Sequence, residues 1–420
     1  MILSGGKTRL NGLQRHQGRR GQRALSVALS VLAAGLACGD DATGGLASAT
    51  PGVSYTNHVV PDVPWSIHVV RIDRAKAPVE FHSAHANGGA LGLSAISAQI
   101  KQLSAALGTP VAAVNGDFYQ RDRAYAGDPR GVQIVNGEVI SAPGGGVAFW
   151  IDAFGHPRVG NVTSLFQVIW PGGAKTPFGL NCQRPTNGVT LYTPALGPST
   201  HTAGGRELVL ERTAGSPWLP LGMAETYTAR VREVREAGDT ALAPETMVLS
   251  IGPGLARTLP DLKAGAEVKL LTASSPTLWH APTAIGGGPM LVRGGRPLKR
   301  GQPVVESYEF SSMLERHPRT AIGWNRTHFV LVEVDGRQKK LSVGMTLEEL
   351  AAYLVKLGCQ EAMNFDGGGS AILWYDGKVR NKPCDGYERP IANSLIVVRK
   401  PAAPRPAAAS PPSPGPGRAE

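Results

Sequence analysis

Three dipeptides that favour tight turns place the strongest constraint on the fold. Asn136-Gly137, Asp335-Gly336 and Asp376-Gly377 each separate two short apolar runs. The type I′ turn between antiparallel strands needs a positive φ at both central residues, and Asn, Asp and Gly adopt that conformation most easily. Each dipeptide therefore predicts a β-hairpin, and together they indicate a chain that is rich in strands.

Helical patterns are fewer than strand patterns. Apolar residues recur with a helical period over residues 93–108 and over residues 346–358, where Thr346 and Glu349 form a capping-box pattern. Runs of strands with a few helices between them predict an α+β fold, with a β-rich mixed sheet core and a few packed helices. Residues 184–275 are nearly all short strands and turns, which indicates a β-rich subdomain.

The first 37 residues have the features of an export signal. A basic stretch ends at Arg23, and an apolar run that is too short to span a bilayer follows it. We expect a signal peptide over residues 1–37 and a protein outside the cytoplasm, either secreted, periplasmic or lipid-anchored in a bacterial envelope. Ordinary cleavage and membrane attachment through a lipidated Cys38 both remain open.

The remaining segments predict one main domain with flexible ends. Residues 38–59 are expected to be a linker, and residues 60–400 contain the periodic patterns of a folded domain. Residues 401–420 are dominated by Pro and Ala without apolar periodicity, so we expect a disordered tail there.

The net charge indicates which classes of binding partner to expect. The formal net charge is +11, but six basic residues precede residue 38, and removing that segment leaves +5. No run of Lys and Arg interleaved with aromatic residues remains, so no nucleic-acid partner is expected.

Cys359 and Cys384 are the favoured disulfide pair, and no spacing of Cys and His resembles a zinc site.

Two matching motifs each end an apolar strand in an amide and a carboxylate. Asn115 and Asp117 stand in "VAAVNGDFY", and Asn364 and Asp366 stand in "AMNFDGGGS". Side chains at i and i+2 of a strand share one face, so each motif presents its amide beside its carboxylate. Alone, the first motif also fits a turn whose side chains bond their own backbone. Together, the motifs predict one cleft where both pairs converge.

Two further segments predict an anion site. The glycines at residues 367–369 interrupt a strand pattern, which indicates a sharp bend or a close approach of a ligand to the backbone. The stretch "ERHPRTAIGW" places Arg316, His317 and Arg319 just ahead of another strand. Guanidinium groups and backbone N–H groups at a glycine-rich turn both bind phosphate or carboxylate.

In this order, the motifs resemble those of the phosphodiester glycosidase family. The resemblance runs from about residue 60 to residue 400, over "AAVNGDFY", "GVTLYTP", "GGGPMLV", "HPRTAIGW", the block 332–374 and "NKPCDGYERPIANSLIVV". Phe365 departs conservatively from the leucine that is common in relatives. The resemblance implies a hydrolase that cleaves the glycosidic bond of a sugar-1-phosphodiester in the cell envelope or an exopolysaccharide, and releases free sugar and a phosphomonoester.

That reaction assigns roles to the candidate residues. A glycosidase usually needs two carboxyl groups, but a phosphate leaving group is a weak base and needs cationic and N–H stabilisation more than a proton. The catalytic candidates are Asp366 first, then Asp117 and Asp335. The substrate-binding candidates are Asn115, Asn364, Arg319, Arg337, Gly367, Gly368, Gly369 and Ser370.

Two other functions use the same residues. A metal-dependent phosphodiesterase would employ the aspartates as oxygen ligands and split the P–O bond. A non-catalytic envelope protein would bind an anionic polysaccharide without turnover. The paired motifs favour catalysis on a sugar-phosphate diester or anionic glycan with no organic cofactor, and they leave metal dependence open.

Overall fold

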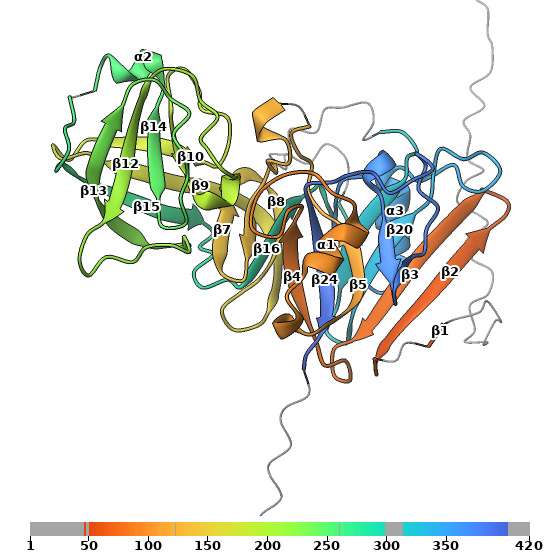
Figure 1. Cartoon of the computed structure of the whole chain (residues 1–420). Coiled ribbons are helices and arrows are strands. Elements are labelled where there is room, and N and C mark those ends of the chain that lie inside the picture. Colours follow the sequence, from red (N-terminus) through yellow and green to blue (C-terminus); the bar gives the residue numbers. More distant parts are fainter. Residues whose placement is uncertain (1–45, 48–49, 122, 260, 299–313, 402–420) are drawn as a thin grey trace, which may run out of the picture. The chain divides into compact units, whose positions relative to one another are not determined.

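The computed structural model describes residues 46–47, 50–121, 123–259, 261–298 and 314–401 (Figure 1). Strands dominate these residues and helices are few, so the predicted α+β class is confirmed. The predicted signal peptide, Cys38 and residues 402–420 of the predicted tail lie outside this part of the chain. Within it, no helix is long and apolar enough to cross a membrane.

The described strands form three sheets. The 8-stranded sheet has the order β1 (Leu46–Ala47), β2 (Val53–Val60), β3 (Trp65–Asp73), β20 (His328–Val334), β19 (Arg319–Trp324), β21 (Glu361–Asn364), β17 (Met290–Arg293) and β18 (Arg296–Pro297). The 5-stranded sheet has the order β23 (Lys378–Val379), β22 (Leu373–Tyr375), β5 (Thr109–Asn115), β24 (Asn393–Arg399) and β4 (Val79–His85).

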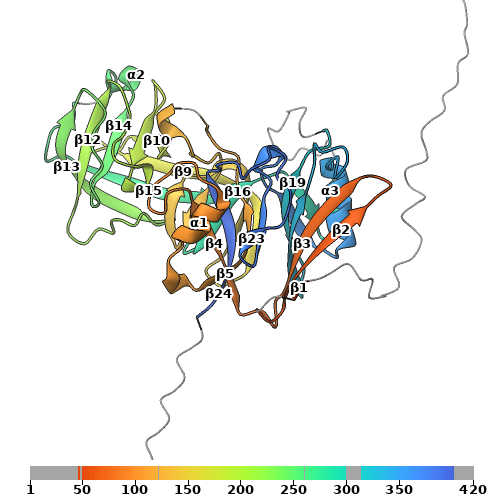
Figure 2. The same cartoon turned by 45° about the vertical axis from the view of Figure 1, so that its right-hand side comes forward.

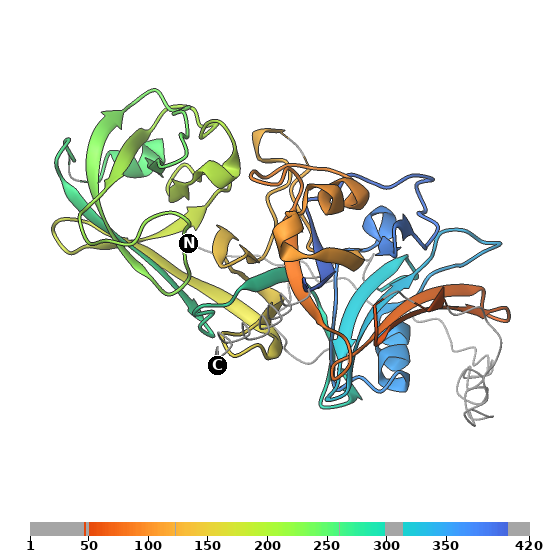
Figure 3. The ribbon, with the colours of Figure 1, turned by 60° about the horizontal axis from the view of Figure 1, so that its bottom comes forward.

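The third sheet is 11-stranded and includes a closed barrel. Its order is β10 (Lys175–Leu180), β11 (Val189–Tyr192), β14 (Met247–Ile251), β12 (Arg206–Arg212), β13 (Thr226–Arg235), β15 (Glu267–Ser275), β9 (Pro157–Ile169), β8 (Gly144–Ile151), β16 (Thr283–Gly287), β6 (Gln133–Val135) and β7 (Glu138–Ser141). Because β9 pairs with both β10 and β15, the seven strands from β10 to β9 in this order close on one another (Figure 3). The division into domains stays a prediction.

The 8-stranded and 5-stranded sheets pack face to face. Val70 and Leu331 of the larger sheet share one apolar cluster with Val114, Leu373 and residues of β24 in the smaller sheet. Helix α3 (Leu347–Lys356) covers the outer face of the larger sheet, and α1 (Ile96–Gln102) covers that of the smaller sheet (Figure 2). A short α2 (Pro253–Ala256) lies within the barrel segment.

Two of the three predicted hairpins are present. Asn136-Gly137 joins β6 to β7 and Asp376-Gly377 joins β22 to β23, and all four residues have a positive φ. The hairpin predicted at Asp335-Gly336 is wrong, because the chain after β20 enters a loop that leads to α3. Its Asp335 side chain bonds to His68 instead of closing a turn.

The predicted helices differ in accuracy. Helix α3 has the expected capping box, in which Thr346 Oγ1 accepts from the Glu349 N–H and the Glu349 carboxylate accepts from the Thr346 N–H. The pattern over residues 93–108 forms only α1 and a short 3-10 turn at Ala105–Leu107. The capping box predicted the position of α3 well, whereas apolar spacing alone predicted a longer helix than α1.

The expected disulfide is wrong, because Cys359 and Cys384 are both free thiols. Cys359 is buried in the apolar cluster between α3 and the 8-stranded sheet, where a Cβ atom on Gly323 would lie 2.7 Å from its Sγ. Cys384 belongs to a loop after β23 and contacts the Asp385 carboxylate. The two thiols therefore lie in different surroundings, one apolar and one beside a carboxylate.

Candidate active site

The two paired motifs meet where β5 of one sheet and β21 of the other end. Asn115 Nδ2 donates to the Asp366 carbonyl oxygen at 2.7 Å, and the Asp366 N–H donates to the Gly116 carbonyl oxygen at 2.9 Å. Face-to-face packing of the two sheets brings these strand ends together although 251 residues separate Asn115 from Asp366.

The two asparagines are internal braces. Asn115 Oδ1 accepts from Thr320 Oγ1 at 2.7 Å and from the Ile372 N–H at 3.1 Å. Asn364 Nδ2 donates to the Gly288 carbonyl oxygen at 2.8 Å, and both asparagines are 1% exposed. Their amides thus hold the two motifs in place and do not line the cavity beside Asp366.

That cavity has a volume of about 200 Å³ and a strongly cationic lining. It is formed by Phe118, His317, Arg319, Arg337, Asp366, Gly367, Gly368, Gly369 and Arg389. Three arginines and one carboxylic acid therefore line the same cavity. An anion with one or two negative charges is the ligand that such a lining favours.

The glycine run lets two arginines approach the backbone. Gly368 has a φ of +61°, and a Cβ atom there would lie 3.0 Å from Arg337 Nη2. A Cβ atom on Gly369 would collide with Arg389 Nη2. The Gly367 N–H donates to Asp366 Oδ1 and the Gly368 N–H donates to Pro318. The run is therefore both a bend and a close approach, but of guanidinium groups rather than of a ligand to these two N–H groups.

Each cavity arginine is held by a fixed partner. Arg389 is bonded to the Asp385 carboxylate through Nε at 2.8 Å and Nη2 at 2.7 Å. Arg319 donates to the carbonyl oxygens of Met345 at 2.9 Å and Glu315 at 2.8 Å. Burial and the neighbouring charge of Arg337 lower the pKa of Arg319 to about 10, so it remains a cation at neutral pH.

His317 orients the third guanidinium. Arg337 Nε donates to His317 Nδ1 at 3.2 Å, and because arginine can only donate, the imidazole proton lies on Nε2. Burial and the charges of Arg337 and Arg319 lower the pKa of His317 below its ordinary value. The Nε2 of His317 is buried and lies 3.5 Å from a carboxylate oxygen of Glu315.

Asp117 lies behind the cavity. Its carboxylate accepts from the Gly131 N–H at 2.6 Å and from the Phe118 N–H at 2.8 Å, and its side chain is 3% exposed. A Cβ atom on Gly286 would collide with Asp117 Oδ2, and one on Gly131 would lie 3.1 Å from the same oxygen. Close packing of backbone around one carboxylate thus requires small residues on two neighbouring segments.

Burial raises the pKa of three neighbouring carboxyl groups. Burial and the charge of Asp366 raise the pKa of Asp117 to about 7. Burial and the charge of Asp117 raise the pKa of Asp128, which the sequence analysis missed, to about 8. Burial also raises the pKa of Asp366, against the opposing effects of the Ser370 hydroxyl and the Gly367 N–H. Such coupled groups with separated pKa values are common in catalytic sites.

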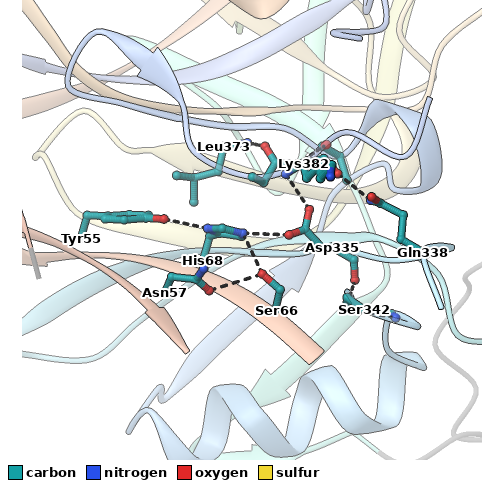
Figure 4. Close-up of polar contacts among 12 residues, drawn as sticks. Tyr55, Asn57, Ser66, His68, Asp335, Gln338, Ser342, Leu373 and Lys382 are labelled. Carbon is teal, nitrogen blue, oxygen red and sulfur yellow. Dashed lines mark hydrogen bonds and ion pairs between the residues drawn. The ribbon is translucent and has the colours of Figure 1, made fainter. Parts of the chain in front are cut away.

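Asp335 and Ser370 do not line the cavity. Asp335 Oδ2 lies 2.9 Å from His68 Nε2, and its Oδ1 accepts from the Lys382 N–H at 2.8 Å (Figure 4). Ser370 is fully buried. The expectation that Asp335 acts on substrate therefore does not fit its position, since its carboxylate is buried and engaged by the protein itself.

Three lining residues were absent from the predicted set. Phe118 directly follows the first motif, and His317 belongs to the arginine-containing stretch, so both had a local signal. Arg389 had none, because its position depends on the loop after β23 folding back over Gly369.

Comparison with known proteins identifies the family resemblance. Residues 231–398 match the family model described as phosphodiester glycosidase, and this segment includes Arg319, Asp366 and Arg389. The predicted resemblance to that family is confirmed. The match supports a hydrolase of the glycosidase type.

Two curated proteins are similar over short segments. The SPbeta prophage-derived uncharacterized protein YomE of Bacillus subtilis (strain 168) is 36% identical over 83 residues, which are 20% of this chain and 13% of that protein. The N-acetylglucosamine-1-phosphodiester alpha-N-acetylglucosaminidase of Bos taurus is 40% identical over 68 residues, which are 16% of this chain and 12% of that protein. The matches thus span about an eighth of each curated relative.

Two solved structures share the fold. A hypothetical protein from Synechocystis has a TM-score of 0.65 at 20% identity, over 82% of this chain and 62% of its own. A protein from Burkholderia pseudomallei K96243, whose name suggests export, has a TM-score of 0.61 at 20% identity, over 80% of this chain and 74% of its own.

Proposed function

We propose that the protein hydrolyses the glycosidic bond of a sugar-1-phosphodiester outside the cytoplasm and releases free sugar and a phosphomonoester. The observation that carries this proposal is the cavity that Arg319, Arg337 and Arg389 line together with Asp366. The family match and the name of the relative from Bos taurus add support.

The three arginines suit the leaving group. A phosphodiester carries one negative charge, and cleavage of the bond between the anomeric carbon and the bridging oxygen leaves a second charge on the departing phosphomonoester. Fixed guanidinium groups bind the first charge and stabilise the second as it develops. Because the leaving oxygen already belongs to a weak base, this arrangement reduces the need for a strong general acid.

Asp366 is the carboxylate that faces the substrate in this proposal. It attacks the anomeric carbon or activates a water molecule for that attack, and it must be ionised to do so. Asp117 retains a proton to higher pH than an ordinary aspartic acid, because burial and the charge of Asp366 raise its pKa to about 7. We assign Asp117 as a positioning residue, because it contacts Phe118 and Gly131 rather than the cavity.

The test uses the full chain and a sugar-1-phosphodiester in water labelled with ¹⁸O. We expect free sugar and a phosphomonoester, with the label in the sugar. Label in the phosphate would overturn the proposal in favour of a phosphodiesterase, and tight binding without turnover would overturn it in favour of a binding protein.

Asp366→Asn then tests the catalytic carboxylate. Loss of a group that acts in the transition state commonly costs 100-fold or more in turnover, roughly. The matched control is Asp376→Asn on the exposed β22–β23 turn, where Asn also tolerates the positive φ. Near-normal turnover by Asp366→Asn would assign this carboxylate a structural role.

A further inference from the structure

A second polar cluster lies between the two packed sheets. His68 on β3 and Glu333 on β20 are direct partners in the antiparallel register, so their side chains share one sheet face. Asp335 follows β20 and meets the same imidazole (Figure 4). The three residues are 3%, 0% and 2% exposed, which places two carboxyl groups and an imidazole inside the protein.

The acids of the cluster have no lysine or arginine partner in the described part of the chain, and the basic group that contacts Asp335 is His68. Neither carboxylate oxygen of Glu333 has a hydrogen-bond donor in the described part of the chain, and no Lys or Arg there forms an ion pair with Glu333 or Asp335. The Asn381 amide approaches Glu333, but it donates to the Ala371 carbonyl oxygen and accepts from the Leu373 N–H. Two ionised carboxylates this deep are costly, so the site requires a proton or a bound cation.

We propose that His68, Glu333 and Asp335 bind one divalent transition metal ion of the zinc or manganese class. One ligand atom from each residue lies within 4.8 Å of the other two. One imidazole nitrogen with two carboxylate oxygens suits these ions, whereas calcium and magnesium favour all-oxygen sites. Two ligands at about 2.1 Å from an ion are at most about 4.2 Å apart, so small side-chain rotations complete the site.

The surroundings of His68 fit a metal ligand. Tyr55 Oη lies 2.8 Å from Nδ1, and a donor–acceptor pair at this nitrogen fixes the ring while Nε2 faces Asp335. Ser66 Oγ lies 3.2 Å from Nε2 and offers a further oxygen. In the bound state, the ion replaces the direct hydrogen bond between His68 and Asp335.

This site goes beyond the proposed function, because its ligands do not line the cavity of Asp366. A bound ion would act by holding the loop after Asp335 in place. Asp335 also accepts from the Lys382 N–H, and its backbone carbonyl accepts from Ser342 Oγ at 2.5 Å. The ion would therefore brace the loop that begins at Asp335 and carries Arg337 into the cavity.

The experiment measures metal directly. The full chain, treated with chelator and dialysed, is titrated with zinc chloride and with manganese chloride by calorimetry, and its metal content is measured by mass spectrometry. We expect one equivalent of at least one ion and a higher Tm in its presence, because a ligand that binds only the folded state stabilises it.

Glu333→Gln is the informative variant, because it keeps the shape of a protonated glutamic acid. We expect it to fold and to lose metal affinity by more than the roughly 10–100-fold that follows loss of a ligand's hydrogen-bond partner. The control is Glu361→Gln. Glu361 lies on β21, away from the cluster, and its carboxylate accepts from the Gly294 N–H. This variant should bind metal as the original chain does.

Equal metal binding by Glu333→Gln, or no binding of either ion by the original chain, would overturn the proposal. A proton on Glu333 would then balance the cluster, and Glu333→Gln would leave the Tm at pH 7 unchanged. If Glu333→Gln fails to fold, Asp335→Asn provides the same binding comparison, with circular dichroism as the check on folding. None of these readouts depends on hydrolysis of a sugar phosphodiester.

Discussion

Asn115 on β5 donates a hydrogen bond to the backbone carbonyl of Asp366, at the end of a strand in the opposite sheet. The same side chain accepts from Thr320 and from the Ile372 N–H. One buried amide thereby connects three segments and fixes the position of the Asp366 backbone beside the cavity. The candidate catalytic group depends on the packing of two sheets rather than on its own strand.

Asn115→Ala should destabilise the protein and impair the site together. The substitution leaves buried partners of three hydrogen bonds unsatisfied, and each such loss costs about 1–3 kcal/mol. We expect a lower urea midpoint with an unchanged m-value, and reduced turnover in the folded fraction. Asn57→Ala on the half-buried part of β2 is the control, and a similar loss there would contradict a special role for Asn115.

Gly369→Ala should weaken binding of the anionic substrate. Its Cβ would collide with Arg389 Nη2 and the Asp385 carboxylate, so the guanidinium must move. We expect KM for a sugar-1-phosphodiester to rise by about tenfold or more, since one charge-assisted bond is worth about 1.5–3 kcal/mol. Gly146→Ala, with no neighbouring atom within 4 Å of the new Cβ, should retain the original KM. Equal kinetics for the two variants would place Arg389 outside the binding site.

Arg337→Gln should reduce both binding and turnover. Arg337 is exposed to the cavity, and its Nε donates to His317, so the substitution removes one positive charge and the partner that fixes the imidazole. We expect a lower kcat and a higher KM, and a weaker dependence of KM on salt concentration. Arg230→Gln on the barrel strand β13 is the charge-matched control. A salt dependence that is identical in both variants would contradict the proposed phosphate contact.

Stability should fall as pH rises from about 4 to about 7. The folded state holds a proton on Asp117 more tightly than the unfolded state does, because its pKa is raised to about 7 from 3.8. The favourable contribution is therefore complete below the unfolded pKa and is lost as pH rises through the folded one. Each unit of raised pKa corresponds to about 1.4 kcal/mol. Denaturant titrations of Asp117→Asn should show a flatter profile over this range, and an unchanged slope would contradict the raised pKa.

Features that depend on nearby residues were predictable from the sequence. The turns at Asn136-Gly137 and Asp376-Gly377 and the capping box of α3 each arise from a few consecutive residues. Asp335-Gly336 has the same local pattern, but His68, 267 residues away in the chain, engages its carboxylate. Tertiary contacts therefore override the turn preference there.

The candidate site shows the same division. Strand periodicity and the paired motifs indicated Asp366 and its neighbours, and the glycine run indicated a close approach. The identity of the approaching group was not predictable, because Arg389 reaches Gly369 only after a loop folds back over it. Buried positions such as those of Asn115 and Asp335 likewise depend on which sheet faces which, and a single strand pattern carries no such information.

The closure of the barrel through β9 also affects which strand edges are open to pairing with another molecule. An open sheet edge exposes a row of unpaired backbone N–H and C=O groups that can recruit a strand from another molecule and begin aggregation. In the described part of the barrel, β9 takes up the edges of both β10 and β15, so the ring offers no terminal strand for such recruitment. Substitutions that weaken the pairing of β10 with β9, such as that between Pro177 and Gln167, would expose the edge of β10. Strands of other molecules could then pair with that edge.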